Sequence, residues 1–212
     1  ADRNRATMTR IACLLSILAA LLAGPVEARQ AGEPRSWSLG AKSLAALPAM
    51  ELEAIDPAAL LAEDAVQAVQ SKGGGALRFA VPRALSATPA TTGRWLQLAD
   101  GGRLWQARFH VANATDINIA LSRFVLPAGA TLHLFSTGQR YYEGPYTAAD
   151  VRKHGKFWSP VVPGDEAVVE LYLPAGMDGA EVALATVNAG YRDLFRHGTS
   201  AAMKAGSCNI DV

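Results

Sequence analysis

The chain has 212 residues, of which 50% are hydrophobic and 18% are charged, and its formal net charge at pH 7 is +1. This length allows one sizeable domain with appended segments and is short for two domains of usual size. The nearly neutral charge, without runs of like charge, argues against nucleic acid or an anionic membrane surface as a partner.

The N-terminal residues 1–28 have the pattern of a secretory signal peptide. Three arginines precede the apolar run IACLLSILAALLAG, and small residues follow it. The run is too short to span a bilayer, so we expect no stable membrane anchor. The pattern predicts a secreted protein that starts at Met8 and is cleaved after Ala28 by signal peptidase; a buried hydrophobic helix is the alternative.

Residues 29–75 predict an arm followed by one short amphipathic helix. Residues 29–55 are rich in Ala, Pro, Ser and Gly and show little periodicity, which indicates a linker or loosely ordered arm. Asp56 is a good N-cap and Pro57 is tolerated at the first helical position. An apolar stripe follows before the glycines at 73–75 end the helix, and it consists of Leu60, Leu61, Val66 and Val69.

From residue 76 to residue 190 the pattern changes to the period of two that is typical of strands. ALRFAVP predicts a short strand that ends at Pro82, and Asp100-Gly101-Gly102 predicts a hairpin between GRWLQLAD and GRLWQARFHV. Further alternating segments follow at roughly ten-residue spacing. Many short strands between turn signals predict a mainly β fold, an antiparallel β-sandwich or jelly roll. One face of the second hairpin strand is predicted to hold Trp105, Ala107, Phe109 and Val111.

The sequence carries no recognisable catalytic or cofactor pattern. The four histidines are scattered, without metal-ligand spacing, and no GxSxG or GDSGG motif occurs. The adjacent carboxylates Glu63-Asp64 and Asp165-Glu166 are expected to be solvated surface charges. We therefore expect no catalytic residue, no metal and no cofactor in this chain.

Aromatic side chains support a second interpretation. Tyr142, Tyr146 and Trp158 are candidate contacts for a glycan or a peptide, as in binding modules built on β-sandwiches. Core packing and strand pairing are the alternative explanation for these side chains. The second hypothesis for the chain is therefore a secreted β-sandwich module that binds glycan or peptide.

The C-terminal residues 191–204 lose the strand pattern and predict an exposed tether, which is where proteases cut. Lys204 lies at its end and is followed by AGSCNIDV. The sequence has two cysteines, and Cys13 lies in the predicted signal peptide, so the exported chain keeps only Cys208. A single cysteine in a secreted chain predicts a partner in another polypeptide or in sequence beyond the chain.

Taken together, these segments resemble the pre-pro-region of a secreted bacterial trypsin-like serine endopeptidase of the lysyl endopeptidase type. The resemblance covers roughly residues 76–212, and its most specific part is the terminal GSCNIDV. GPYT, FWSP, GDE and VELYLP, in this order, add support.

This resemblance implies a role for each segment. Residues 76–190 would be the pro-domain, which assists folding of the downstream protease domain in cis and inhibits it. Residues 205–212 would begin the mature domain, after self-processing at Lys204. Cys208 would form a disulfide with a cysteine beyond Val212, and the catalytic residues would also lie beyond it.

Overall fold

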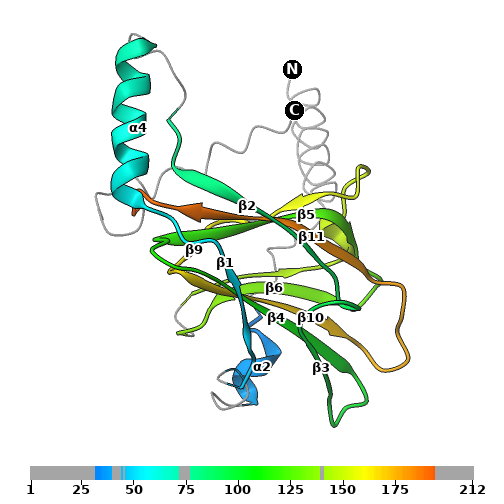
Figure 1. The fold of residues 1–212 in the computed structure, drawn as a ribbon. Coiled ribbons are helices and arrows are strands. Elements are labelled where there is room, and N and C mark those ends of the chain that lie inside the picture. Colours follow the sequence, from blue (N-terminus) through cyan, green and yellow to red (C-terminus); the bar gives the residue numbers. More distant parts are fainter. Residues whose placement is uncertain (1–31, 40–43, 45, 72–76, 139–140, 194–212) are drawn as a thin grey trace, which may run out of the picture. The chain divides into compact units, whose positions relative to one another are not determined.

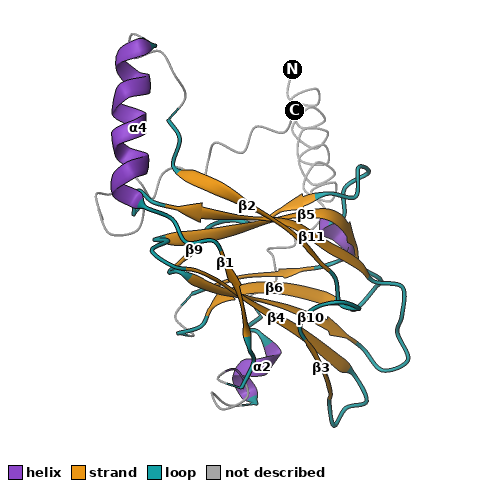
Figure 2. Cartoon of the chain, viewed as in Figure 1, coloured by secondary structure: helices purple, strands orange, loops and turns teal. Residues whose placement is uncertain are grey.

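A computed structural model of the chain describes residues 32–39, 44, 46–71, 77–138 and 141–193. Within this part, two β-sheets pack face to face as two layers (Figures 1 and 2). All strand pairs but one are antiparallel in the part described. The predicted mainly β antiparallel sandwich is confirmed.

The first sheet has six strands in the order β1-β4-β10-β6-β7, and β3 pairs with β4 beside this path. The predicted hairpin is the β3–β4 pair, in which Trp95 lies opposite Trp105. In the turn, the amide of Gly102 donates to Asp100 and Gly101 has a φ of 81°, which glycine adopts without strain. The strands are β1 (Ala49–Leu52), β3 (Arg94–Gln97), β4 (Arg103–Val111), β6 (Thr131–Ser136), β7 (Tyr142–Tyr146) and β10 (Glu166–Leu173).

The second sheet has five strands in the order β2-β11-β5-β8, and β9 also pairs with β5. Its strands are β2 (Ala80–Ala87), β5 (Asp116–Val125), β8 (Phe157–Trp158), β9 (Val162–Pro163) and β11 (Glu181–Gly190). A short 3₁₀ helix, η1 (Ala148–Asp150), precedes β8. The strand expected to end at Pro82 in fact continues to Ala87. Proline is tolerated here because β2 is an edge strand, so a missing amide breaks no second ladder.

The inner faces of the two sheets form one hydrophobic core. The alternation predicted for β4 is confirmed, because Trp105, Ala107, Phe109 and Val111 are all buried in this core. The second sheet contributes the matching residues of β5 and β11, which are Ile117, Ile119, Leu121, Val182, Leu184, Val187 and Ala189. Alternation with a period of two places these apolar side chains between the layers, with one irregularity in β11, where the register shifts between Leu184 and Thr186.

The segment expected to be a loosely ordered arm is instead part of the fold. Its strand β1 pairs in parallel with β4, and Met50 lies opposite Phe109. Upstream of β1, helix α2 (Arg35–Ser38) lies on the outer face of the first sheet. Trp37 packs there edge-on against Phe135, with ring centroids 5.9 Å apart.

A buried carboxyl holds α2 to this face. The amide of Ser36 lies 3.4 Å from each oxygen of Glu170, and the side-chain amide of Gln106 donates to Glu170 at 3.0 Å. Burial raises the pKa of Glu170 above its ordinary value. Because α2 covers part of the outer face of the first sheet, the side chains on both faces of β10 are buried. The alternation of apolar residues does not predict this burial on the outer face.

The predicted helix is α4 (Pro57–Gln70), and its predicted cap is confirmed: Asp56 accepts hydrogen bonds from the amides of Ala58 and Ala59. Its apolar stripe does not face the core. Leu60 is the stripe residue that packs against the core, and no residue of α4 is buried. Figure 1 shows why, because α4 extends past the ends of the strands instead of lying on a sheet face.

We predict that Phe109→Ala destabilises the domain by about 3–5 kcal/mol, because it removes a fully buried ring between the layers. Urea unfolding followed by tryptophan fluorescence measures the change. Trp158→Ala is the matched control, since its side chain is 64% exposed and its removal should cost far less. Equal losses in the two variants would contradict this description of the core.

Candidate functional site

The predicted processing and disulfide residues Ala28, Lys204 and Cys208 lie outside the described residues. Within the described part, no group of three or more His, Cys, Asp and Glu residues is placed to hold a metal ion. No helix in the same part of the chain is long and apolar enough to cross a membrane.

The three aromatic residues proposed as ligand contacts do not form one binding surface. Tyr146 is 2% exposed, and its ring packs edge-on against Phe157 in the core, so its assignment as a contact is wrong. Tyr142 packs edge-on against Trp37, on the outer face of the first sheet. Trp158 is the exposed member of the three. Core packing and strand pairing, the alternative explanation, therefore fit Tyr146 and Tyr142.

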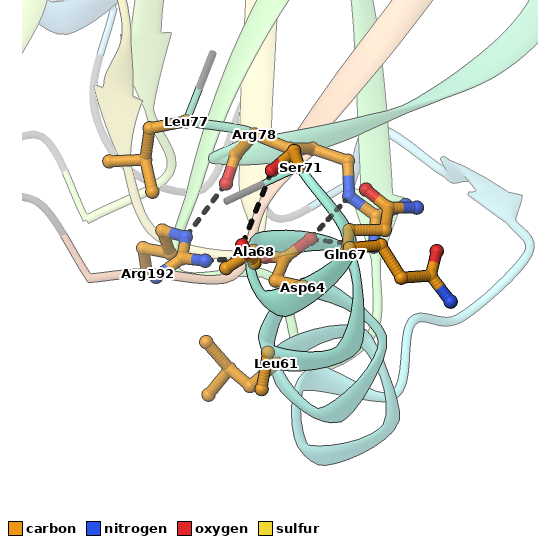
Figure 3. Close-up of a pocket in the computed structure, with 10 residues that line it drawn as sticks. Leu61, Asp64, Gln67, Ala68, Ser71, Leu77, Arg78 and Arg192 are labelled. Carbon is orange, nitrogen blue, oxygen red and sulfur yellow. Dashed lines mark hydrogen bonds and ion pairs between the residues drawn. The ribbon is translucent and has the colours of Figure 1, made fainter. Parts of the chain in front are cut away.

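A cluster of charged and polar side chains around Asp64 links α4 to the sandwich. Arg78 precedes β2 and Arg192 follows β11, and Figure 3 shows Asp64 between these two side chains. Arg78 Nη2 lies 2.9 Å from Asp64 Oδ1, and Arg192 binds the other carboxylate oxygen. The hydroxyl of Tyr191 donates to the same Oδ2 at 2.6 Å. We call these four residues the Asp64 cluster.

The surroundings of Asp64 favour its charged form. The Tyr191 hydroxyl is the largest single influence and lowers the pKa of Asp64; partial burial acts in the opposite direction. Hydrogen bonds from Arg192 and Arg78 lower the pKa further. The Asp64 side chain is 12% exposed, so water screens these contacts less than it screens an ordinary surface pair. The carboxylate therefore stays ionised and holds the three elements together.

A groove of about 810 Å³ lies beside the Asp64 cluster, between α4 and the residues that lead into β2. Figure 3 shows Leu61 and Ala68 on its helical wall, Leu77 on the opposite wall and Arg192 at its edge. Leu77 is 70% exposed and Leu61 is 43% exposed, so the described residues leave these apolar side chains largely uncovered. The groove thus combines the apolar side chains of Leu61, Ala65, Ala68 and Leu77 with polar lining groups, which are Gln67, Gln70, Ser71, Arg78, Arg192 and the paired carboxylate of Asp64.

The expectation that the paired carboxylates are solvated is wrong for two of the four. Asp64 binds both arginines of its cluster. Glu166 binds Arg108, with Nη2 at 2.5 and 2.7 Å from its two oxygens. Glu63 and Asp165 are more than half exposed, as expected. The partner arginines lie far away in sequence, so the local pattern gave no sign of these pairs.

A second charged group lies on the outer face of the first sheet. His110 Nδ1 is 2.5 Å from Glu51 on β1, and His110 Nε2 is 3.5 Å from Asp165. The hydrogen bond with Glu51 raises the pKa of His110 above its ordinary 6.5, and partial burial opposes this rise. A protonated His110 therefore ties edge strand β1 to β4.

Comparison with known proteins identifies the family to which most of the described residues belong. Residues 46–189 match the lysyl endopeptidase N-terminal domain family. Over 144 residues the chain is 30% identical to a lysyl endopeptidase of Pseudomonas aeruginosa, an alignment that covers 60% of this chain and 29% of the relative. The chain thus spans less than a third of that relative's length. No solved structure matches the chain.

The structure defines a two-layered β-sandwich domain with an attached helix. The family match runs from just before β1 to Ala189, the last residue but one of β11, and so includes α4 and strands of both sheets. The chain belongs to the lysyl endopeptidase N-terminal domain family.

We predict that Asp64→Asn loosens α4 and leaves the sandwich folded, because the helix loses its ionic contacts while the core is unchanged. Hydrogen exchange followed by mass spectrometry should show faster exchange over residues 57–70 at neutral pH. Glu63→Gln is the matched control, since Glu63 is 58% exposed and pairs with Arg78 alone among these arginines. Unchanged exchange in Asp64→Asn would mean that the cluster does not hold the helix.

We also predict a pH-dependent contribution from His110. Its pKa is raised in the folded chain, so its stabilisation is complete below pH 6.5 and disappears as the pH rises through the folded pKa. Urea unfolding midpoints of the wild type and His110→Gln, compared from about pH 5 to about pH 9, should therefore converge at the alkaline end. A difference that is independent of pH would contradict the assigned ion pairs.

Proposed function

We propose that this chain is the N-terminal part of a secreted serine endopeptidase precursor. In this proposal the β-sandwich assists the folding of a protease domain that follows in the same polypeptide, and it inhibits that domain until cleavage. The observation that carries the proposal is the family match over residues 46–189, which includes the whole sandwich.

Two physical effects support an assisting and inhibiting role. A domain that binds the native protease and not its unfolded chain stabilises the native state by mass action. Covalent attachment raises the effective concentration of the domain, so modest contacts are sufficient while the tether is intact. Cleavage of the tether removes this advantage and releases the protease.

The processing scheme is part of the same proposal. Signal peptidase would cut after Ala28, and the protease would cut after Lys204, at the end of the tether. Cys208 would then belong to the mature domain and pair with a later cysteine. A protease that cleaves after lysine can process its own precursor at Lys204, which is why this residue is the proposed site.

We predict that Lys204→Gln in the complete precursor stops maturation, because glutamine lacks the charge that a lysine-specific protease recognises. Gel electrophoresis and N-terminal sequencing of the secreted product measure this. The matched control is Lys153→Gln, an exposed lysine within the domain, which should mature normally. Normal processing of Lys204→Gln, or a stop codon directly after Val212, would contradict the proposal.

A further inference from the structure

Helix α4 presents an apolar surface that the described residues leave uncovered. At 100° of rotation per residue, six apolar residues together span about 160° of the helix circumference: Leu61, Ala62, Ala65, Val66, Ala68 and Val69. Val66 is 57% exposed and Val69 is 80% exposed, and no charged residue follows Asp64 within the helix. We call this area the α4 surface, and it consists of Leu61, Ala62, Ala65, Val66, Ala68 and Val69 together with Leu77 across the groove.

We propose that the α4 surface is the docking site for the protease domain that follows in the same precursor. This inference rests on the proposed function and names the surface that performs it. An uncovered apolar surface on a secreted domain is typical of an interaction site. Because the surface carries no charge of its own, its partner must be recognised by apolar contact.

The last described residues of the chain lie beside α4, which favours a partner that follows them in the same polypeptide. Arg192 lines the groove and binds Asp64 of the helix, and it lies two residues after the end of β11. The described part of the chain therefore ends close to the edge of the α4 surface. The related lysyl endopeptidase extends far beyond the matched region, which is 29% of its length.

The size of the α4 surface favours a partner in the same chain over a free one. A helix of 14 residues is about 21 Å long and about 10 Å wide, so one face offers on the order of 200 Å². Stable association of separate proteins needs about 800 Å² from each partner. A covalently attached partner needs less, because its effective concentration reaches the millimolar range.

The test is the refolding of the complete precursor from denaturant, with the yield of active peptidase as the readout. Val66→Asp combined with Val69→Asp should lower this yield at least about tenfold, since two charges would enter an apolar contact. The matched control is Leu39→Asp combined with Trp158→Asp. It places two charges at exposed apolar positions away from α4 and should leave the yield unchanged.

Further measurements separate the possible outcomes. Circular dichroism of the 212-residue chain checks that each variant folds, and Val69→Ser is the milder variant if the double substitution melts the helix.

If deletion of residues 32–193 does not impair refolding, the proposed function is wrong. If the deletion impairs refolding and the α4 variants do not, only the docking site is wrong. If the wild-type 212-residue chain forms a dimer that the α4 variants abolish, a second copy occupies the surface and the inference is overturned.

Discussion

The packing of two sheets against each other decides where every other element of this domain lies. The space between the layers is filled by side chains such as Trp105, Phe109 and Phe124, each fully buried. A helix cannot enter this space without displacing them, because protein interiors are close-packed. The outer face of the first sheet is partly covered by α2, where Trp37 packs against Phe135. Helix α4 is therefore left beside the strand ends, where the polar contacts of Asp64 and the packing of Leu60 hold it.

These polar contacts connect the beginning and the end of the sandwich through one carboxylate. Arg78 leads into β2, Arg192 follows β11, and both bind Asp64. The guanidinium carbon of Arg192 also lies 5.4 Å from the ring centre of Tyr191. Tyr191 was expected in the tether and is instead 3% exposed within the core. The folded domain thus extends past β11, and its last described residues lie beside α4.

The sequence predicted the elements that depend on local patterns. The alternation of apolar residues predicted the buried face of β4. The Asp100-Gly101-Gly102 turn signal predicted the β3–β4 hairpin, and Asp56-Pro57 predicted the start of α4. The sequence could not predict features that arise from distant contacts. The parallel pairing of β1 depends on β4, 50 or more residues later, as in the pairing of Leu52 with Val111. Asp64 and Glu166 resembled solvated charges because their arginine partners come from other strands and loops.

The candidate site was missed for a related reason. An apolar stripe on a predicted helix normally indicates the face that packs on the core. In α4 that inference holds for Leu60, whereas Val66 and Val69 face away from the core. Periodicity identifies an apolar face but not the molecule that covers it. The structure shows that no described residue covers Val66 and Val69, which are 57% and 80% exposed.

Because α4 is attached mainly by charged contacts, the free energy needed to separate it from the sandwich has a different origin from that needed to separate a strand. Separating a strand from the sandwich exposes core side chains, at a cost of about 25 cal/mol for each Å² of apolar surface. Separating α4 mainly exchanges ionic contacts for water, since no residue of the helix is buried. We therefore expect that separating α4 from the sandwich costs less free energy than unfolding the domain. Such an element can adjust to a partner while the sandwich keeps its structure.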